Sequence, residues 1–393
     1  MASDPPPTDT AEQNRERASQ VAEPLLRWYA REGRTLPWRD IGDPYRILVS
    51  EIMLQQTRVS TVLNYYPAFL ERFPSIADLA TATEEEVLAQ WSGLGFYRRA
   101  RNLHACAREV VSQYGGEVPR DPALLGALPG IGRYTVGAIL SSAHNARLPI
   151  LDGNVIRVLS RLFCVAGDPA TAEVNRRLWT LATEVLPEDR PGDFNQSLMD
   201  LGATVCKPVA PHCGRCPLAD LCTARGRGVS EEYPHAGRRT KVTFVKRVAL
   251  FAERADGSFL LIRRPEGGLL ANMWELPSVE KTEGQESGLV AAQLSSYLGI
   301  DSVASQVATS EHRFSHRHWS TEIYRIDAPD TALPAPSAGT LDGELRWTHR
   351  GELADLAWPE ASRKTVLACL GRAGPGYPSG VPIRDAAESP PGR

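Results

Sequence analysis

Two carboxylates in the first half of the chain have surroundings suited to acid–base chemistry. Glu51 stands in an apolar run at residues 47–56, where burial would raise its pKa and suit it to act as a general acid. The same residue could instead mark the polar edge of an amphipathic helix. Asp152 precedes a helical pattern, where Asp is a common N-cap, and a cap and a catalytic carboxylate both require a rigid side chain. Two such groups could cleave a glycosidic bond, one protonating the leaving group and the other stabilising or attacking the sugar cation.

Four closely spaced cysteines form a second candidate site: Cys206, Cys213, Cys216 and Cys222. Thiolates at this spacing can hold one soft metal centre, and composition alone is compatible with a tetrahedral zinc ion or with a [4Fe–4S] cluster. Four unrelated cysteines are the alternative. The other cysteines stand in apolar contexts and are predicted to be core residues: Cys106, Cys164 and Cys369.

A glycine-containing turn, Leu128-Pro-Gly130-Ile-Gly132, lies between two helical patterns. Glycine lets a phosphate approach the backbone closely, and the N-terminus of the next helix favours negative charge. The helix that follows is rich in small residues, as close helix packing requires. The turn therefore predicts a phosphate contact, and a plain helix–turn–helix connection is the alternative.

Composition limits the class of protein. With 393 residues, 42% of them apolar and 23% charged, the chain is long enough for two or three globular domains. No apolar run approaches the roughly 18 residues of a membrane span, and the first ten residues lack the apolar core of a secretory signal. We therefore expect no membrane association and a cytoplasmic location with reduced thiols. The net charge is −3, but basic runs at 98–108 and 225–247 could contact phosphate or simply face solvent.

The periodicity of apolar residues divides the chain into segments. In chain order these are a disordered tail at 1–18, an all-helical domain at 19–224, a basic linker at 225–241, an α+β domain at 242–370 and a disordered tail at 371–393. In the helical domain, helices are predicted at 45–57, 84–90, 103–114, 123–128, 135–143 and 154–165. In the α+β domain, we predict a hairpin around Asp256-Gly257, strands at 318–326 and 345–348, and a helix near 288–298.

Four motifs of the helical region occur in one order: Glu51-x3-Gln55-Gln56-Thr57, Gly93-Leu-Gly-Phe-Tyr, Leu128-Pro-Gly-Ile-Gly-Arg-Tyr and Leu151-Asp-Gly-Asn-Val. Together they resemble the adenine DNA glycosylases of the MutY type, within the endonuclease III or helix–hairpin–helix superfamily. The resemblance extends from about Pro37 to Cys222. It implies a mainly α glycosylase domain whose glycine turn anchors the DNA backbone without reading sequence. The cysteine spacing resembles the iron–sulfur loop of the same superfamily and implies one structural [4Fe–4S] cluster.

The resemblance also implies roles, position by position. Glu51 would be the acid at adenine N7 and Asp152 the partner of the sugar cation, which Tyr134 and Asn154 would orient or stabilise. The pocket of the flipped adenine would be formed by Trp38, Arg39 and Gln196. The DNA contacts would be Gln55, Gln56, Phe96, Leu128, Gly130 and Gly132, with Gln56 and Phe96 wedging the gap and meeting the opposite base. The adenine must first leave the base stack.

Position 134 separates two branches of this superfamily. The endonuclease III branch places a lysine there, and its amine forms a Schiff base and breaks the strand. Tyr134 cannot form an imine, so we predict base removal that leaves an abasic site, a monofunctional reaction. Phe96 replaces the tyrosine more usual in the family, and an aromatic wedge depends on its ring more than on a hydroxyl.

Residues 268–277, Gly-Leu-Leu-Ala-Asn-Met-Trp-Glu-Leu-Pro, resemble the opening of a Nudix-like domain. The predicted helix that follows, at 288–298, lacks the glutamates with which a Nudix hydrolase holds divalent metal, so we expect no phosphohydrolysis. Phe314-Ser315-His316 resembles the loop with which adenine DNA glycosylases read 8-oxoguanine on the facing strand. A simple hairpin turn is the alternative.

Taken together, the resemblances imply a monomeric enzyme that hydrolyses the glycosidic bond of adenine opposite 8-oxoguanine or guanine in double-stranded DNA. A glycosylase and lyase for oxidised pyrimidines is the nearest alternative, and Tyr134 and the second domain both argue against it. A non-catalytic DNA-binding protein, with the cluster as a structural or redox element, is a second alternative.

Overall fold

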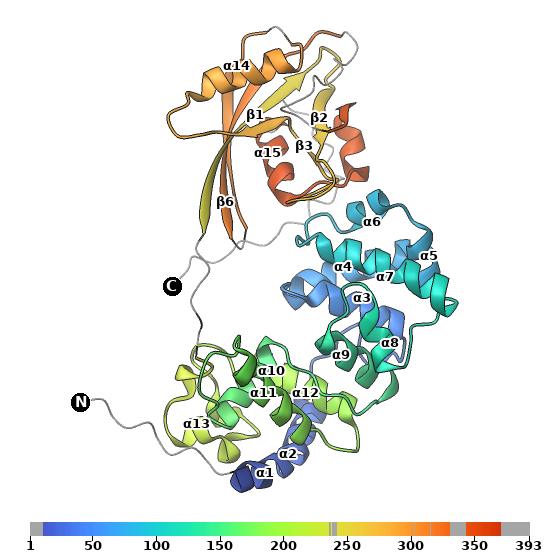
Figure 1. Cartoon of the computed structure of the whole chain (residues 1–393), viewed down its shortest axis with the longest axis vertical. Helices are drawn as coiled ribbons and strands as arrows, with labels where there is room; N and C mark the ends of the chain where they lie inside the picture. Colours follow the sequence, from blue (N-terminus) through green and yellow to red (C-terminus); the bar gives the residue numbers. More distant parts are fainter. Residues whose placement is uncertain are drawn as a thin grey trace, which may run out of the picture. The chain divides into compact units, whose positions relative to one another are not determined.

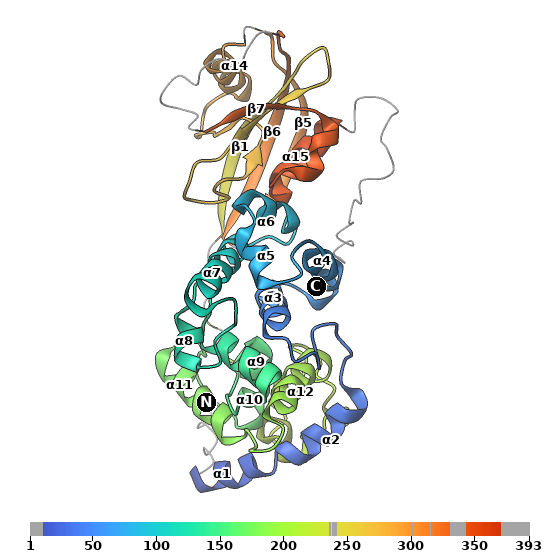
Figure 2. The same cartoon turned by 90° about the vertical axis from the view of Figure 1, so that its right-hand side faces the viewer.

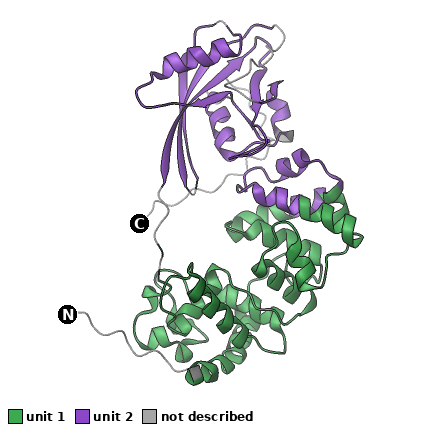
Figure 3. Ribbon diagram, in the orientation of Figure 1, with its two compact units in different colours: residues 1–66, 73–80, 105–239 green, residues 67–72, 81–104, 240–393 purple. Residues whose placement is uncertain are grey.

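The computed structural model describes residues 11–235, 237, 242–300, 302–314, 316–330 and 343–370. The chain forms two compact units, coloured separately in Figure 3. Unit 1 comprises residues 1–66, 73–80 and 105–239, and unit 2 comprises residues 67–72, 81–104 and 240–393. The division does not follow the chain, because two helical segments from the first hundred residues belong with the C-terminal sheet.

The helical part of the chain is labelled in Figure 1. Its α-helices are α1 (Ala11–Ser19), α2 (Ala22–Glu32), α3 (Pro44–Leu54), α4 (Val59–Arg72), α5 (Ile76–Thr81), α6 (Glu84–Gln90), α7 (Arg98–Tyr114), α8 (Pro122–Ala127), α9 (Arg133–His144), α10 (Gly153–Leu162), α11 (Ala172–Glu184), α12 (Pro191–Thr204) and α13 (Thr223–Gly226). Short 3-10 turns follow at η1 (Cys213–Arg215), η2 (Ala219–Leu221) and η3 (Ser230–Glu232). The helices predicted from periodicity are confirmed, with ends that shift by a few residues. Among the described residues, no helix combines the length and apolar composition of a membrane span.

Two predicted segments are wrong where the structure describes them. Residues 11–18 of the predicted disordered tail belong to α1. Ala18 and Val21 are buried and join this part of the chain to the core of unit 1. The predicted linker is folded over residues 225–235, where the buried Tyr233 accepts a hydrogen bond at its carbonyl from Nε of Arg161 at 2.9 Å. Residues 1–10, 236, 238–241 and 371–393 lie outside the described residues.

Local sequence signals fix where the helices of unit 1 begin. Asp43 caps α3, accepting from the backbone N–H of Tyr45 at 3.0 Å, and Pro44 occupies the first turn. Asp152 caps α10, since its Oδ1 accepts from the N–H of Val155 at 2.7 Å, so the N-cap prediction is confirmed. Gly132 is the N-cap residue of α9, which has no side-chain cap.

Close packing of helices holds these starts in place. A Cβ added to Gly137 of α9 would lie 2.4 Å from the carbonyl oxygen of Pro149. A Cβ added to Gly202 of α12 would lie 2.6 Å from Cβ of Asn154, at the start of α10. Real Cβ atoms do not approach so closely, so glycine is required at position 137 for α9 to pack on the segment before α10, and at position 202 for α12 to pack on α10.

The strands of unit 2 form one sheet in the order β3-β2-β1-β6-β5, with β4 paired to β1 and β7 to β2. Their bounds are β1 (Thr243–Glu253), β2 (Phe259–Arg263), β3 (Trp274–Glu275), β4 (Ser278–Glu280), β5 (Ser305–Arg313), β6 (Arg317–Asp327) and β7 (Leu345–Thr348). β1 and β6 are parallel, and the remaining pairs are antiparallel. The predicted hairpin is confirmed by the pairing of Glu253 with Phe259, and the two further predicted strands correspond to β6 and β7.

Alternation along β1 gives the sheet two apolar faces. Val248 and Leu250 pack with α14 (Ser287–Tyr297), the helix predicted near 288–298. Ala249 and Phe251 pack on the opposite face with α15 (Glu360–Leu370), which follows the 3-10 helix η4 (Arg350–Asp355). Figure 2 shows the sheet between these two helices. Unit 2 is therefore an α/β sandwich with a helix on each side.

Side-chain hydrogen bonds explain why segment 81–104 belongs to unit 2. Glu85 of α6 accepts from the indole Nε1–H of Trp274 at 3.1 Å. Ser92, just after α6, donates to the carbonyl of Trp358 at 2.8 Å. The loop between α6 and α7 is thus attached to the same body as the sheet.

Candidate active site

A cavity of about 610 Å³ opens in unit 1, where the C-terminal end of α3 meets the N-terminal ends of α9 and α10. The residues predicted for chemistry or for the adenine pocket all line it: Glu51, Tyr134, Asp152, Asn154, Trp38, Arg39 and Gln196. Some predicted DNA contacts line it as well: Gln55, Gln56, Gly130 and Gly132. Residues that are far apart in sequence therefore share one cavity.

Glu51 is 3% exposed, although α3 brings it to the cavity. The pKa of this carboxyl is raised from 4.5 to about 7: burial raises it most, the hydrogen bond from Tyr134 lowers it, and the nearby charge of Asp152 raises it. The polar-edge interpretation of Glu51 is therefore wrong. A carboxyl that is partly protonated at neutral pH can donate a proton to a leaving group in the cavity.

Tyr134, in the first turn of α9, connects to Glu51 directly. Its hydroxyl donates to Oε2 of Glu51 at 2.8 Å and lies 3.4 Å from the sulfur of Met199. Burial, followed by the negative charges of Glu51 and Asp152, raises the pKa of Tyr134 well above 10. Tyr134 therefore stays a neutral phenol that can hold the carboxyl but cannot act as an amine nucleophile.

Asp152 and Asn154 form a hydrogen-bonded pair at the start of α10. Nδ2 of Asn154 donates to Oδ2 of Asp152 at 2.8 Å, and the N–H of Val155 donates to the other oxygen. Donors on both oxygens, at the positive end of a helix, stabilise a carboxylate anion. This anion lines the same cavity as the carboxyl of Glu51.

Arg157 supports this pair from one turn further along α10, and sequence reasoning missed it. Its Nη2 donates to Oδ1 of Asn154 at 2.9 Å and to the carbonyl of Gly202 at 2.7 Å. Its Nε donates to the carbonyl of Cys206 at 2.7 Å. One guanidinium therefore joins the active-site pair to the first residue of the cysteine loop.

The predicted adenine pocket is fixed by a buried ion pair. The side chain of Asp200 is fully buried and binds Nη2 of Arg39 at 2.7 Å and Nη2 of Arg34 at 2.6 Å. Trp38 is buried against Tyr66, with ring centroids 5.3 Å apart. Sequence reasoning identified Arg39 and Trp38 but missed Asp200 and Arg34, whose pairing spans 166 residues of chain and has no local pattern.

The side-chain amide of Gln196, on α12, faces α9. Its Nε2 donates to Oγ of Ser142 at 3.1 Å, which fixes the orientation of the amide. Because Nε2 is bound to Ser142, the orientation of the side-chain oxygen of Gln196 is fixed as well. An oriented amide of this kind suits hydrogen bonding to the edge of a base.

The glycine turn between α8 and α9 also borders the cavity. Gly130 has φ +79°, a left-handed conformation that favours glycine, and Gly132 precedes the first turn of α9. Leu128, also predicted as a DNA contact, is buried, and its carbonyl accepts from the N–H of Ile131 at 3.1 Å. Leu128 therefore holds the turn together from inside.

The four cysteines of the second site line one small cavity in unit 1, beside Arg161, and none forms a disulfide. Burial raises the pKa of Cys216 to about 12 and also raises that of Cys222, so a bound cation would favour the thiolate form of these two sulfurs. Nη1 of Arg161 lies 3.3 Å from Sγ of Cys206 and adds positive charge next to them. In the described part of the chain, no three His, Cys, Asp or Glu side chains group closely enough for a single metal ion. Four cysteine sulfurs that line one cavity fit a [4Fe–4S] cluster, which takes one thiolate per iron.

The remaining predicted contacts belong to unit 2. Phe96 is 46% exposed and has φ +48°. Phe314 follows β5, where its N–H donates to the carbonyl of Arg317 at 2.7 Å, so this segment is the hairpin between β5 and β6. His316 is exposed, and Ser315 lies outside the described residues.

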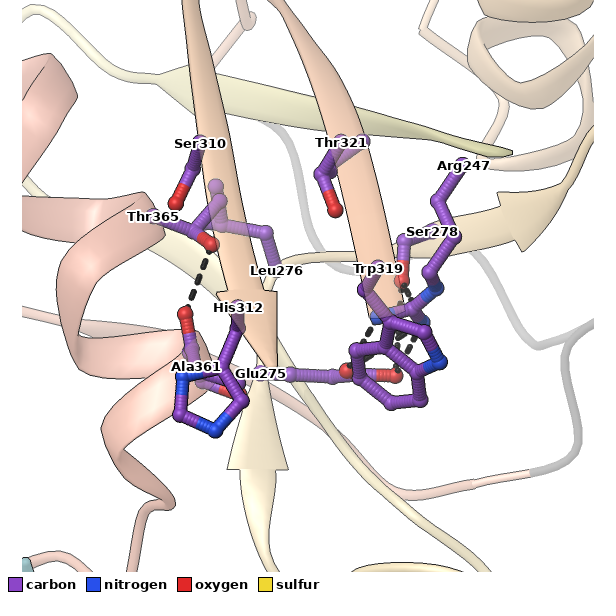
Figure 4. A pocket seen from close by; sticks show the side chains of 12 residues that line it. Arg247, Glu275, Leu276, Ser278, Ser310, His312, Trp319, Thr321, Ala361 and Thr365 are labelled. Atoms are coloured by element: carbon purple, nitrogen blue, oxygen red, sulfur yellow. Dashed lines mark hydrogen bonds and ion pairs between the residues drawn. The ribbon is translucent and has the colours of Figure 1, made fainter. Parts of the chain in front are cut away.

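A stack of side chains supports this hairpin from inside unit 2. The ring of Phe314 meets Trp319 edge-on at 4.8 Å, and the guanidinium of Arg247 lies 4.0 Å from the Trp319 ring centroid. Arg247 is paired with Glu275 at 3.1 Å, as Figure 4 shows. The aromatic residue of the hairpin is therefore linked, through Trp319, to the buried pair of Arg247 and Glu275.

Comparison with known proteins matches each part of the chain. Residues 49–184 match the HhH-GPD superfamily base excision DNA repair protein model, 206–222 the iron–sulfur binding domain of endonuclease III and 248–368 the NUDIX domain. The predicted fold class and the predicted [4Fe–4S] cofactor are confirmed, and the matched iron–sulfur segment begins and ends at the first and last of the four cysteines.

Two curated relatives extend over most of the chain. The adenine DNA glycosylase of Mus musculus is 36% identical, covering 86% of this chain and 76% of the relative, and that of Homo sapiens is 35% identical, covering 88% and 73%. A solved thermostable thymine-DNA glycosylase is 30% identical, covers 56% of this chain and all of its own, and has a TM-score of 0.49. With identity at this level over most of both sequences, the chain belongs to the adenine DNA glycosylase family, enzymes of base excision repair that hydrolyse the N-glycosyl bond of adenine.

Proposed function

We propose that this enzyme removes adenine that faces 8-oxoguanine or guanine in double-stranded DNA and leaves an abasic site without breaking the strand. One observation carries the proposal: the buried carboxyl of Glu51, with a pKa of about 7, shares a cavity with the hydrogen-bonded carboxylate of Asp152. Glu51 protonates the departing base at N7, and Asp152 stabilises or attacks the positive charge that develops on the sugar. Asn154 and Tyr134 hold the two carboxyl groups in place.

The size and lining of the cavity support the binding of an extruded adenine. A space of about 610 Å³ accommodates a nucleoside that has left the duplex. Trp38 and Arg39 form one wall, and the oriented amide of Gln196 hydrogen-bonds the base edge. Gln55 and Gln56 contact the DNA at the cavity mouth, and the backbone at Gly130 and Gly132 contacts phosphate.

Tyr134 supports a monofunctional reaction. A strand-breaking glycosylase needs an amine that forms an imine with the sugar, and a phenol held to Glu51 offers none. Water therefore completes the reaction, and the product is an abasic site.

The hairpin between β5 and β6 supports recognition of the opposite base. We assign this recognition to Phe314 and His316, with Ser315 between them, because the exposed imidazole and the supported ring stand at the hairpin turn. Phe96 fills the gap in the stack. The enzyme acts as a monomer on DNA in the cytoplasm, at the nucleoid, where thiols remain available to bind iron.

A panel of duplexes tests the proposal. The wild type should release adenine opposite 8-oxoguanine and opposite guanine, and strand cleavage should appear only after alkali treatment. Duplexes with adenine opposite thymine, or with thymine glycol, should remain intact. Nicking of the thymine glycol duplex without alkali, or trapping of a protein–DNA adduct by borohydride, would overturn the monofunctional assignment. Unchanged adenine release by Glu51→Gln would overturn the catalytic one.

A further inference from the structure

The loop that presents Phe96 is held by a buried arginine. Arg99 is 8% exposed, yet it lies only three residues from the exposed Phe96. Its Nη2 donates to the carbonyls of Leu94 at 3.3 Å and Gly95 at 3.2 Å. Its backbone N–H donates to the carbonyl of Phe96 at 2.8 Å. One residue therefore binds three successive carbonyls of this loop.

The same guanidinium also contacts two aromatic rings. It lies 5.5 Å from the ring centroid of Trp91, which is fully buried, and 5.4 Å from that of Phe96. The indole of Trp91 donates to the Gly95 carbonyl at 3.2 Å. Trp91 and Arg99 thus converge on the residue before Phe96, and the guanidinium supports the Phe96 ring.

The backbone of this loop requires such support. Gly93, Gly95 and Phe96 have φ values of +96°, +69° and +48°. The left-handed conformation is unfavourable for a residue with a side chain, by about 1 kcal/mol or more, so Phe96 keeps it only where the surroundings impose it. Burying a guanidinium is also costly, and burial lowers the pKa of Arg99 to about 10. The strained backbone and the buried guanidinium both belong to the loop that exposes the ring of Phe96.

We infer that Arg99 is a positioning residue, which fixes the loop at residues 93–96 so that Phe96 is preorganised to enter the base stack. The inference rests on the proposed role of Phe96 as a wedge. It predicts that Arg99 acts on DNA through Phe96 and not as a phosphate contact. Because the loop is already ordered, insertion of the Phe96 ring into the base stack carries no additional cost in loop entropy.

Double-mutant analysis tests the inference on the full-length, cluster-loaded protein. The readouts are single-turnover release of adenine opposite 8-oxoguanine and the fluorescence of 2-aminopurine placed beside that adenine, which reports unstacking. Phe96→Ala should lower both, with the rate falling about tenfold or more. Arg99→Met should cause a similar loss, and the double variant should be no worse than Phe96→Ala alone. Arg99→Lys keeps the charge but loses the forked geometry, so it should resemble Arg99→Met.

Arg98→Met is the matched control, because it removes the same charge from an exposed neighbour. At saturating protein it should keep the 2-aminopurine signal that Arg99→Met loses. Fully additive losses in the double variant, or wild-type behaviour of Arg99→Lys, would overturn the inference while leaving the wedge role intact. Unchanged unstacking in Phe96→Ala would instead overturn the wedge role itself, and the positioning role with it. If Arg99→Met does not fold, Arg99→Gln, which keeps one amide donor, gives the same comparison.

Discussion

The hydroxyl of Tyr134 donates a hydrogen bond of 2.8 Å to the carboxyl of Glu51, across 83 residues of chain. A tyrosine at position 134 has two effects. A phenol there cannot form an imine with the sugar, and it also limits how far burial raises the pKa of Glu51. The residue on which the proposed monofunctional reaction depends therefore also lowers the pKa of the proposed acid.

Replacement of Tyr134 by Phe should move the pH dependence of adenine release to higher pH. The hydrogen bond favours the charged form of Glu51, so its loss raises the pKa of Glu51 above the present value of about 7. Since the protonated form is the active acid, activity falls as the pH rises through this pKa. The midpoint of that fall should rise by about one unit, the value of a hydrogen bond to a charged group. Single-turnover rates between pH 5 and pH 9 measure it.

Tyr45→Phe provides the control for this shift. Tyr45 also donates a buried hydrogen bond, to the carbonyl of Phe73 at 2.8 Å, and it does not line the cavity. Its replacement should leave the midpoint in place. A midpoint that stays fixed or moves to lower pH in Tyr134→Phe would contradict the role assigned to the hydroxyl.

Replacement of Glu51 by Gln should abolish most activity and stabilise the fold at high pH. Loss of a general acid costs about 10²- to 10⁴-fold in rate. The pKa of Glu51 is raised from 4.5 in the unfolded chain to about 7 in the fold, so the wild-type fold is favoured while this group is protonated and loses that contribution as the pH rises through 7. Gln stays neutral, so the variant should gain up to about 3 kcal/mol relative to the wild type above pH 7 and little near pH 4.5.

Thermal unfolding at several pH values measures the difference in stability between Glu51→Gln and the wild type. Glu86→Gln is the control, for which the opposite pH dependence is expected. Hydrogen bonds from Thr83 lower the pKa of Glu86, so its contribution is present above its ordinary pKa and is lost as the pH falls. Glu86→Gln should therefore lose stability at neutral pH. A Glu51→Gln protein that is less stable than the wild type at pH 8 would show that the wild-type carboxyl is not destabilised by burial.

Local pattern predicted several of the helices and strands, and the family resemblance supplied most of the predicted cavity residues, but long-range contacts were not predictable from either. Asp152 could be recognised as a cap because the helical pattern starts directly after it. Helix α1 was missed because its sequence is polar and only a few of its residues, such as Ala18, reach the core. Arg157 has no local signal, since its partners Cys206 and Gly202 lie more than forty residues away.

Replacement of Asp200 by Asn should destabilise the protein strongly. The buried carboxylate neutralises both Arg34 and Arg39, and the amide of Asn leaves their charges uncompensated. Removal of one partner from a buried ion pair costs about 3–5 kcal/mol in the free energy of unfolding. The exposed pair of Arg27 and Glu23 is the control, because Glu23→Gln should cost less than about 1 kcal/mol. Denaturant unfolding measures both losses in the free energy of unfolding. Equal losses in Asp200→Asn and Glu23→Gln would contradict the structural role of Asp200.

Replacement of Gly202 by Ala should impair adenine release more than it impairs folding. The new methyl group would lie 2.6 Å from Cβ of Asn154 and 3.1 Å from its carbonyl oxygen, so the start of α10 has to move away from α12. This movement displaces the amide that donates to Asp152, and an error of about 1 Å in a catalytic group can cost about 10²-fold in rate. Gly126→Ala is the control, because its Cβ would meet only Cγ2 of Val136, at an ordinary 3.5 Å. Single-turnover rates beside melting temperatures separate the two effects, and a Gly202→Ala protein with a wild-type rate would show that α10 tolerates the shift.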